Sequence, residues 1–83
     1  MKVLYFAAFR ERLNRAQEEV DVPSDIATVG ALIDWLTQRD EAAALAFADR
    51  KLVRTAVNGR MVDHDGLLSG ANVVALMPPM TGG

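Results

Sequence analysis

The residues with the clearest chemical potential stand at the end of the sequence, in "MPPMTGG". Two prolines restrict the backbone to extended conformations, which lowers the entropy lost when the residues after them become ordered. The two final glycines carry no β-carbon, so a narrow channel can admit them. From Pro79 to Gly83 the chain can reach about 16 Å. This pattern predicts an arm that enters the active site of another protein, with Gly83 as the reacting residue and an inserted stretch of Pro78, Pro79, Met80, Thr81 and Gly82. A frayed end is the competing interpretation, and it does not explain the prolines.

The remaining sequence lacks the motifs of a self-contained enzyme. His64, the one histidine, stands between Asp63 and Asp65. A single imidazole in a turn has no ligand-spaced partners, so we interpret the triplet as a surface turn and expect no metal. The six glycines form no phosphate-binding loop. We therefore expect this chain itself to bind no cofactor.

Composition excludes several classes of function. The 83 residues are 51% hydrophobic and 24% charged with a net charge of −2, as in one globular domain without a basic face for nucleic acid. The absence of cysteine excludes disulfides, iron–sulfur clusters and a persulfide on a side chain. The apolar run from Val3 to Phe9 is too short for a targeting segment, and the uncharged stretch from Gly66 onward is interrupted by prolines and glycines. We expect a cytoplasmic protein with no membrane partner.

The first half of the chain predicts two strands and one main helix. Residues 2–8 are typical of a buried strand, and 10–15 of a short helical turn whose Arg10, Arg12 and Arg15 are solvated. Residues 19–22 alternate like a half-exposed strand, with Val20 and Val22 on one face. The main helix is expected after an N-cap at Thr28, with Trp35 at the rim of the core and a buried stripe of Val29, Leu32, Ile33 and Leu36.

The second half predicts a short helix and three strands. The helix is expected over 41–49 and the strands over 52–57, 60–62 and 72–77, with a hairpin turn at Asn58-Gly59. The fold class is therefore α+β, a mixed sheet of four to five strands packed on one main helix. We expect a domain over residues 1–78 and a flexible tail over 79–83. The sheet face away from the helix would be only partly covered and is the place to look for partners.

Four stretches of the sequence match a known family. "KVLYFA", "TVGAL", "AVNGRMV" and "VALMPPMTGG" resemble the small, sulfur-carrier subunit of molybdopterin synthase. The resemblance runs over nearly the whole chain, although the family often has two aromatic residues where this chain has Leu76 and Met77. It implies a β-grasp, ubiquitin-like fold, in agreement with the order of elements given above.

The resemblance also implies a mechanism in which partners do the catalysis. An activating enzyme would adenylate the carboxylate of Gly83 with ATP and magnesium, and a sulfur donor would convert the adenylate into a thiocarboxylate. The large synthase subunit, in a heterotetramer, would hold the active site and pass the sulfur to a cyclic pyranopterin precursor, so this chain is a non-catalytic donor. Phe6, Met61 and Met77 resemble the family's hydrophobic docking positions; the alternative is that all three belong to the core.

Two other functions remain open on the sequence. A sulfur carrier for thiamine synthesis shares the fold and the Gly-Gly end, but such chains are generally shorter and lack the Pro-Pro pair. A ubiquitin-like protein modifier would use the same activation of Gly83 and then attach to lysines. Isopeptide adducts in cells would favour the modifier, and a thiocarboxylate alone would favour the carrier.

Overall fold

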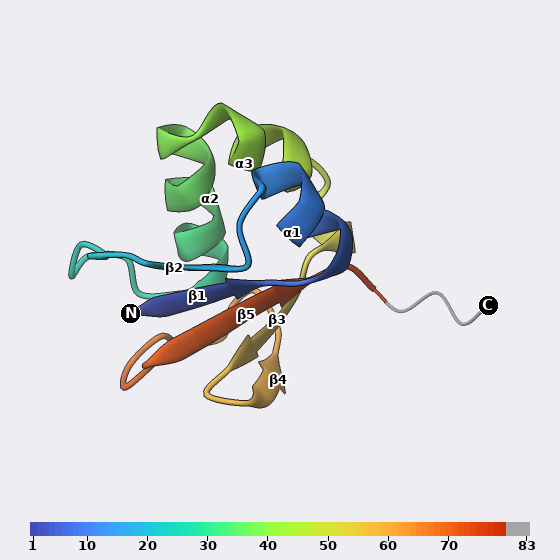
Figure 1. Ribbon diagram of the computed structural model, residues 1–83. Coiled ribbons are helices and arrows are strands. Elements are labelled where there is room, and N and C mark those ends of the chain that lie inside the picture. The colour runs from blue at the N-terminus through green and yellow to red at the C-terminus, as the bar shows by residue number, and fades with distance from the viewer. Residues whose placement is uncertain (80–83) are drawn as a thin grey trace.

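The computed structural model describes residues 1–79, which form one five-stranded mixed sheet with helices on one side (Figure 1). The strands are β1 (Lys2–Tyr5), β2 (Gln17–Glu19), β3 (Arg54–Val57), β4 (Arg60–Val62) and β5 (Val73–Met77). Their order across the sheet is β2-β1-β5-β3-β4. β1 and β5 are parallel, and the other neighbouring pairs are antiparallel. The last strand in sequence is therefore the central strand of the sheet.

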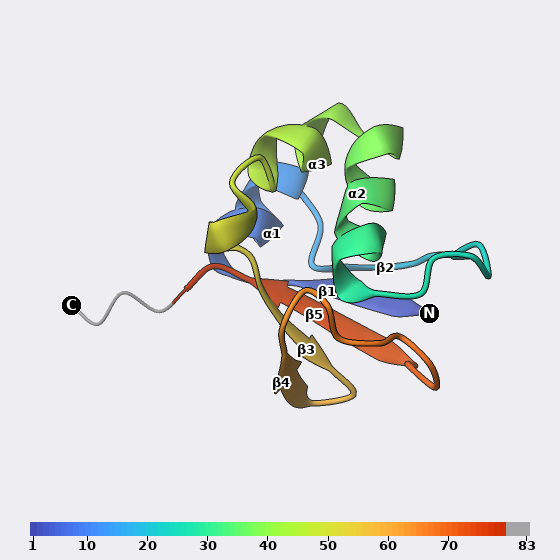
Figure 2. The ribbon, with the colours of Figure 1, turned by 180° about the vertical axis from the view of Figure 1, so that it is seen from behind.

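The helices lie together on one face of this sheet, as the view from behind also shows (Figure 2). They are α1 (Ala7–Leu13), α2 (Val29–Arg39) and α3 (Glu41–Ala46), and a 3-10 turn, η1 (Arg50–Leu52), leads into β3. None of the helices in residues 1–79 has the length and apolar character needed to cross a membrane. The α+β class, the mixed sheet and the main helix predicted from the sequence are confirmed.

The main helix starts where the sequence predicted. The Thr28 hydroxyl oxygen accepts a hydrogen bond from the Ala31 N–H at 3.1 Å, which satisfies one of the free donors at the helix N-terminus. The predicted stripe is buried: Val29, Leu32, Ile33 and Leu36 are each at most 1% exposed. Trp35 is half-buried against the core, as expected for a residue at its rim, and the Arg39 guanidinium lies 4.9 Å from its ring centroid.

The core lies between this helix layer and the sheet. Alternate residues of the two central parallel strands point into it, namely Val3, Tyr5, Val74 and Leu76. Phe47 is fully buried and meets Phe9 edge to face, with ring centroids 4.9 Å apart. This contact joins the end of α3 to α1 and holds both on the sheet.

The predicted hairpin is confirmed and carries an additional anchor. Asn58 and Gly59 both have positive φ, 49° and 83°, as a tight turn between twisted antiparallel strands requires. The Asn58 amide also donates to the Gly70 carbonyl at 3.1 Å and accepts from the Asn72 N–H at 2.9 Å. The turn is thus tied to the loop that leads into β5.

The prediction of a first strand over 2–8 was too long. β1 ends at Tyr5, and Ala7, at a φ of 51°, turns the chain into α1. The helix forms because Phe9 and Leu13, four residues apart, both reach the core, and it ends at Asn14 in the left-handed conformation. The predicted turn over 10–15 is therefore a helix over 7–13, which adds a helix between the first two strands.

The predicted second strand was displaced along the chain. β2 spans Gln17–Glu19 instead of 19–22, because pairing with β1 sets Lys2 opposite Glu19 and Leu4 opposite Gln17. Val20 is still buried, but it lies just beyond the strand, where its N–H donates to the Met1 carbonyl at 2.9 Å.

Candidate functional site

The predicted tail leaves the middle of the sheet, and we call its first residues, Pro78 and Pro79, the tail root. β5 ends at Met77, which is paired with Arg54 of β3, and on the other side the Phe6 N–H donates to the Leu76 carbonyl at 3.1 Å. Pro78 and Pro79 follow and are half-buried. Proline has no N–H to extend a ladder, so the strand stops there as predicted. Met80, Thr81, Gly82 and Gly83 lie outside the described residues; their roles, and the boundary after residue 78, stay predictions.

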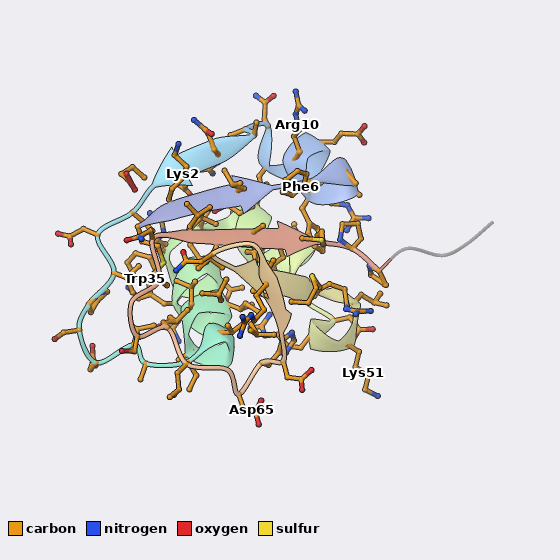
Figure 3. The ribbon with its side chains drawn as sticks, turned by 90° about the horizontal axis from the view of Figure 1, so that it is seen from below. Lys2, Phe6, Arg10, Trp35, Lys51 and Asp65 are labelled. Carbon is orange, nitrogen blue, oxygen red and sulfur yellow. The ribbon has the colours of Figure 1, made fainter. Side chains whose placement is uncertain are left out.

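The sheet face opposite the helices is open and partly apolar. Residues paired across a sheet share a face, so one row on this open face crosses four strands: Leu4, Ala75, Ala56 and Met61. The next row toward the tail contains Phe6, Met77 and Arg54. Figure 3 looks onto this face and shows Phe6 at the end of β1, beside the end of β5.

The three predicted docking residues lie on this face and not in the core. Phe6 is 46% exposed, Met61 is 49% exposed and Met77 is half-buried. The strand alternation explains the arrangement, because the neighbours of Phe6 and Met77 in sequence, Tyr5 and Leu76, point inward and are buried. The alternative that all three are core residues is wrong. The structure places Phe6 and Met77 side by side next to the tail root, and Met61 on the same face, two strands away from β5.

His64 has a structural bond in the described chain. Its ring Nε2 lies 2.7 Å from the Val53 carbonyl oxygen, and its own carbonyl accepts from the Gly30 N–H at 2.8 Å. These bonds fix the turn after β4 against the start of α2. The approach is close at Gly30, because a β-carbon there would lie 3.2 Å from the His64 carbonyl oxygen.

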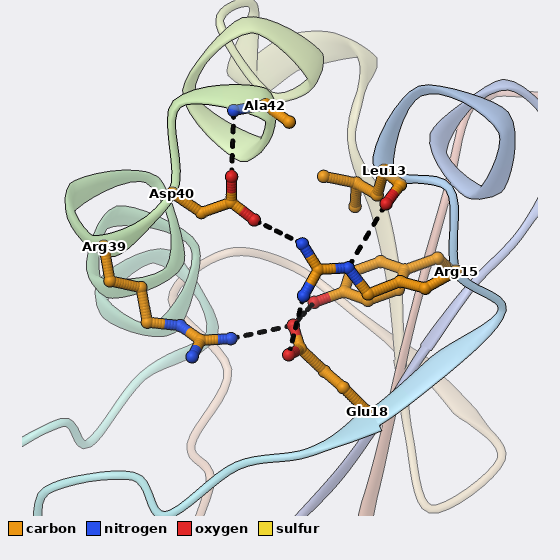
Figure 4. Close-up of polar contacts among 7 residues, drawn as sticks. Leu13, Arg15, Glu18, Arg39, Asp40 and Ala42 are labelled. Carbon is orange, nitrogen blue, oxygen red and sulfur yellow. Dashed lines mark hydrogen bonds and ion pairs between the residues drawn. The ribbon is translucent and has the colours of Figure 1, made fainter.

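A polar network joins the second strand to the helix layer (Figure 4). The Tyr5 hydroxyl donates to Glu18 at 2.5 Å, and the same carboxylate accepts from Arg15 at 3.0 Å and Arg39 at 2.8 Å. Arg15 also donates to Asp40 at 2.5 Å. The expectation that Arg10, Arg12 and Arg15 are all solvated is therefore wrong for Arg15.

The network changes the titration of its members. Burial raises the pKa of Tyr5, and the hydrogen bond and charge of Glu18 raise it further. Burial also acts to raise the pKa of Glu18, but the hydrogen bonds from Tyr5 and Arg39 and the charges of Arg39 and Arg15 outweigh it, so this pKa lies below its ordinary value. Burial acts to lower the pKa of Arg15, but Glu18 and Asp40 raise it overall. The network thus keeps an ionised carboxylate beside the core, a structural role.

Comparison with known families decides the identity of this fold. A model of the ThiS family matches residues 3–83, nearly the whole chain. The chain belongs to the ThiS family. Together with the curated relatives described next, this match confirms the resemblance drawn from the sequence motifs, and the solved structures confirm the β-grasp fold.

Two relatives of this ThiS-family chain are molybdopterin synthase sulfur carrier subunits. The one from Escherichia coli is 39% identical over 83 residues, which covers 100% of this chain and 99% of the relative. The one from Haemophilus influenzae is 30% identical with the same coverage. Among solved structures, small archaeal modifier protein 1 of Haloferax volcanii superposes with a TM-score of 0.77 at 26% identity, over 96% of this chain and 97% of the other.

Within this ThiS-family fold, sequence reasoning missed two features of the described residues. One is Glu18, which points inward although this was not expected. Glu18 and Val20 are two residues apart, so their side chains lie on the same face of the extended chain. The other is an apolar groove beside Pro78 and Pro79, lined by Leu45 and Leu52. The alternation with Val20 could have indicated the direction of Glu18, whereas no local motif marks the groove, because it depends on how α1, α3 and η1 pack.

Proposed function

We propose that this chain is the sulfur carrier of molybdenum cofactor synthesis and that it works through the carboxylate of Gly83. The observation that carries the proposal is the full-length similarity to molybdopterin synthase sulfur carrier subunits, which extends through the Gly82-Gly83 end. Those relatives favour molybdopterin over thiamine synthesis. The proposal places the chain in the cytoplasm with its partners.

The chemistry would proceed in two steps on partner enzymes. An activating enzyme with ATP and magnesium would join the Gly83 carboxylate to AMP and release pyrophosphate, because a free carboxylate is a poor electrophile. Sulfide delivered by a sulfur donor would then attack the acyl carbon, and AMP would leave with the carboxylate oxygen and yield a thiocarboxylate, with no change in the oxidation state of sulfur. The chain contains no cysteine, so Gly83 is the place in this sequence where sulfur can be loaded.

The large subunit of molybdopterin synthase would then receive the loaded tail. Its active site would pass the sulfur to a cyclic pyranopterin precursor, which becomes the dithiolene of molybdopterin. This chain would supply positioning, through the stiff Pro78-Pro79 pair, and a soft nucleophile, the thiocarboxylate sulfur.

Docking of the folded body must supplement the tail. Ordering about five tail residues costs on the order of 5–10 kcal/mol, reduced by the two prolines. A slim segment with few apolar atoms does not offset that cost alone. The exposed Phe6 and Met61 and the half-buried Met77 offer apolar area next to the tail root. Methionine adapts to different surfaces, which suits a carrier that visits both the activating enzyme and the synthase.

The decisive experiment is an intact-mass measurement on the protein isolated from its own cells. The expected result is a fraction whose mass reflects one oxygen replaced by sulfur, with the change localised to Gly83 by fragmentation. In vitro, the purified chain with the activating enzyme, ATP, magnesium and a sulfide source should give the same species. A chain that stays at its unmodified mass under both conditions would contradict the proposal.

A second candidate is a protein modifier, favoured by the similarity to small archaeal modifier protein 1. In that case the Gly83 adenylate would be attacked by a lysine amine, and an isopeptide bond would form. Mass spectrometry of digested cell extracts distinguishes the two functions. After digestion, a modifier leaves a fragment that ends in its C-terminal residues attached to lysines of other proteins. A carrier leaves no such adducts.

A further inference from the structure

A second apolar surface lies beside the tail root, on the helix side of the sheet. It is a groove of about 430 Å³ between α1, α3 and η1, and the tail root forms one of its walls. Its apolar lining includes Phe9, Leu45, Leu52, Pro78 and Pro79, and its polar rim has Arg12 and Asp49. We call it the leucine groove. It is distinct from the open sheet face, which carries Phe6, Met61 and Met77.

The two leucines of this groove are poorly covered by their own chain. Leu45 is 78% exposed and Leu52 is 52% exposed, since α3 packs on the core through Ala43 and Ala46 and η1 buries none of its residues. Residues 1–79 have five exposed large hydrophobic side chains, and two are in the groove and two, Phe6 and Met61, are on the open face. The fifth, Leu67, lines a pocket with Met1, at the opposite end of β1. Exposed apolar area is thus concentrated on two sides of the tail root.

The reach of the tail brings the groove within the area that a partner can cover. Four residues follow Pro79, and at full extension they span about 13–14 Å. An enzyme that holds Gly83 in its active site therefore has its surface within that distance of Pro79. A standard interface buries about 800 Å² on each partner, equivalent to a disc of about 16 Å radius. A patch of that size around Pro79 includes the leucine groove, because Pro78 and Pro79 are part of its wall.

The charge at the rim of the groove indicates which charged group the partner would place opposite it. Arg12 is exposed and forms no ion pair among residues 1–79. The Asp49 carboxylate caps η1, where one of its oxygens accepts from the Lys51 N–H at 3.2 Å. Arg12 is the cation among the residues that line the groove, and its guanidinium pairs best with a carboxylate.

We propose that the leucine groove is a second docking site for the large subunit of molybdopterin synthase, occupied by an apolar side chain of that subunit next to a carboxylate that pairs with Arg12. The inference rests on the proposed function, because it takes its partner from it. The large subunit would then contact the chain on both sides of the tail root, on the open sheet face and in the groove. Two-sided contact orients the tail as well as binding it.

The test measures binding of the large synthase subunit from the same organism to the full-length chain by calorimetry. Leu45→Asp and Leu52→Asp should each weaken binding at least about ten-fold, which is 1.4 kcal/mol. Leu67→Asp is the matched control: it makes the same change at an exposed leucine far from the tail and should bind like wild type. Arg12→Glu should weaken binding and reduce its salt dependence, and Arg12→Lys should restore part of the loss.

The outcomes separate this inference from the proposed function. Suppose that Leu45→Asp and Leu52→Asp both bind with wild-type affinity, while Met61→Asp binds more weakly. The proposal that the groove is a docking site is then wrong, and the proposed carrier function is unaffected. Failure of the wild-type chain to bind the large subunit overturns both. Thermal melts check folding of each variant; if Leu52→Asp unfolds, Leu45→Asp decides, because that side chain is the more exposed of the two.

Discussion

Phe6 and Met77 lie side by side on the open sheet face, at the point where the chain leaves the sheet. The link is a backbone hydrogen bond, from the Phe6 N–H to the Leu76 carbonyl oxygen at 3.1 Å, which extends the parallel ladder of β1 and β5 by one residue. Because the bond fixes both backbones, the two side chains cannot separate without loss of the ladder end. The backbone next to the tail root is therefore held in place, and a partner does not have to order it on binding.

The open face gives the first prediction. Phe6→Ala and Met61→Asp should each weaken binding of the large subunit at least about ten-fold, since exposed aromatic and methionine anchors carry much of the energy of an interface. Unfolding stability should change little, because both side chains are about half exposed. Calorimetric titration gives the affinity and urea unfolding the stability. If the variants unfold without a separable binding defect, the docking surface lies elsewhere.

The second prediction concerns Gly83. Deletion of this residue should abolish adenylation and sulfur transfer, because it displaces by one residue the carboxylate that we propose to react. The melting temperature should stay nearly unchanged, since the core described above ends at Leu76. Pyrophosphate release by the activating enzyme and synthase turnover are the readouts. Full synthase activity of the truncated chain would refute the assigned role.

The third prediction is that Gly82 tolerates little enlargement. Gly82→Val should lower turnover with the partners, because a branched side chain meets the wall of a channel shaped for bare backbone. Gly82→Ala, the smaller change, should lower it less. Circular dichroism melts that match wild type would show that folding is intact. Wild-type kinetics for Gly82→Val would argue against a narrow channel.

Local signals were enough to predict part of the fold. Thr28 caps α2 through its own side chain, and Asn58-Gly59 forms its turn through backbone preferences of those two residues. Neither depends on distant parts of the chain. β1 was predicted too long because Phe6 is apolar like its neighbours, and only the positive φ of Ala7 ends the strand. A sequence window does not reveal that change of direction.

Tertiary contacts determine what the sequence could not predict. Arg15 and Asp40 are 25 positions apart, and their ion pair exists because β2 packs beside the junction of α2 and α3. The exposure of Leu45 has a similar origin. The run "EAAALAFA" is apolar on every side, so its sequence does not say which residues face the core. Only the packing of Ala43 and Ala46 turns Leu45 outward.

The fourth prediction addresses a buried hydroxyl. Thr55 is fully buried in β3, and its Oγ1 has no hydrogen-bond partner among the described residues. Thr55→Val keeps the branched shape and removes the unsatisfied group, so it should stabilise the fold by about 1 kcal/mol. Thr55→Ala is the control, since it also removes the hydroxyl but leaves a cavity and should destabilise. Urea denaturation measures both. A destabilised Thr55→Val would mean that the hydroxyl has a partner.

The fifth prediction follows from Glu18. Its pKa is lowered in the folded state, so its contribution to stability is fully present above its unfolded pKa of about 4.3 and is lost as pH falls through the folded pKa. Glu18→Gln keeps the shape but removes the charge that Arg15 and Arg39 share, and should cost about 1–3 kcal/mol near pH 7.

The pH dependence distinguishes this charge effect from a loss of packing. The difference in unfolding free energy between wild type and Glu18→Gln should stay constant from pH 7 down to about pH 5 and then shrink in more acidic solution, because wild-type Glu18 becomes neutral there as well. Glu19→Gln is the matched control, since Glu19 is exposed and, within residues 1–79, pairs only with the Met1 amine. It should show a much smaller difference at every pH, as expected for an exposed pair. A Glu18→Gln deficit that stays the same at pH 3 would show that the carboxylate acts through shape and hydrogen bonding rather than through its charge.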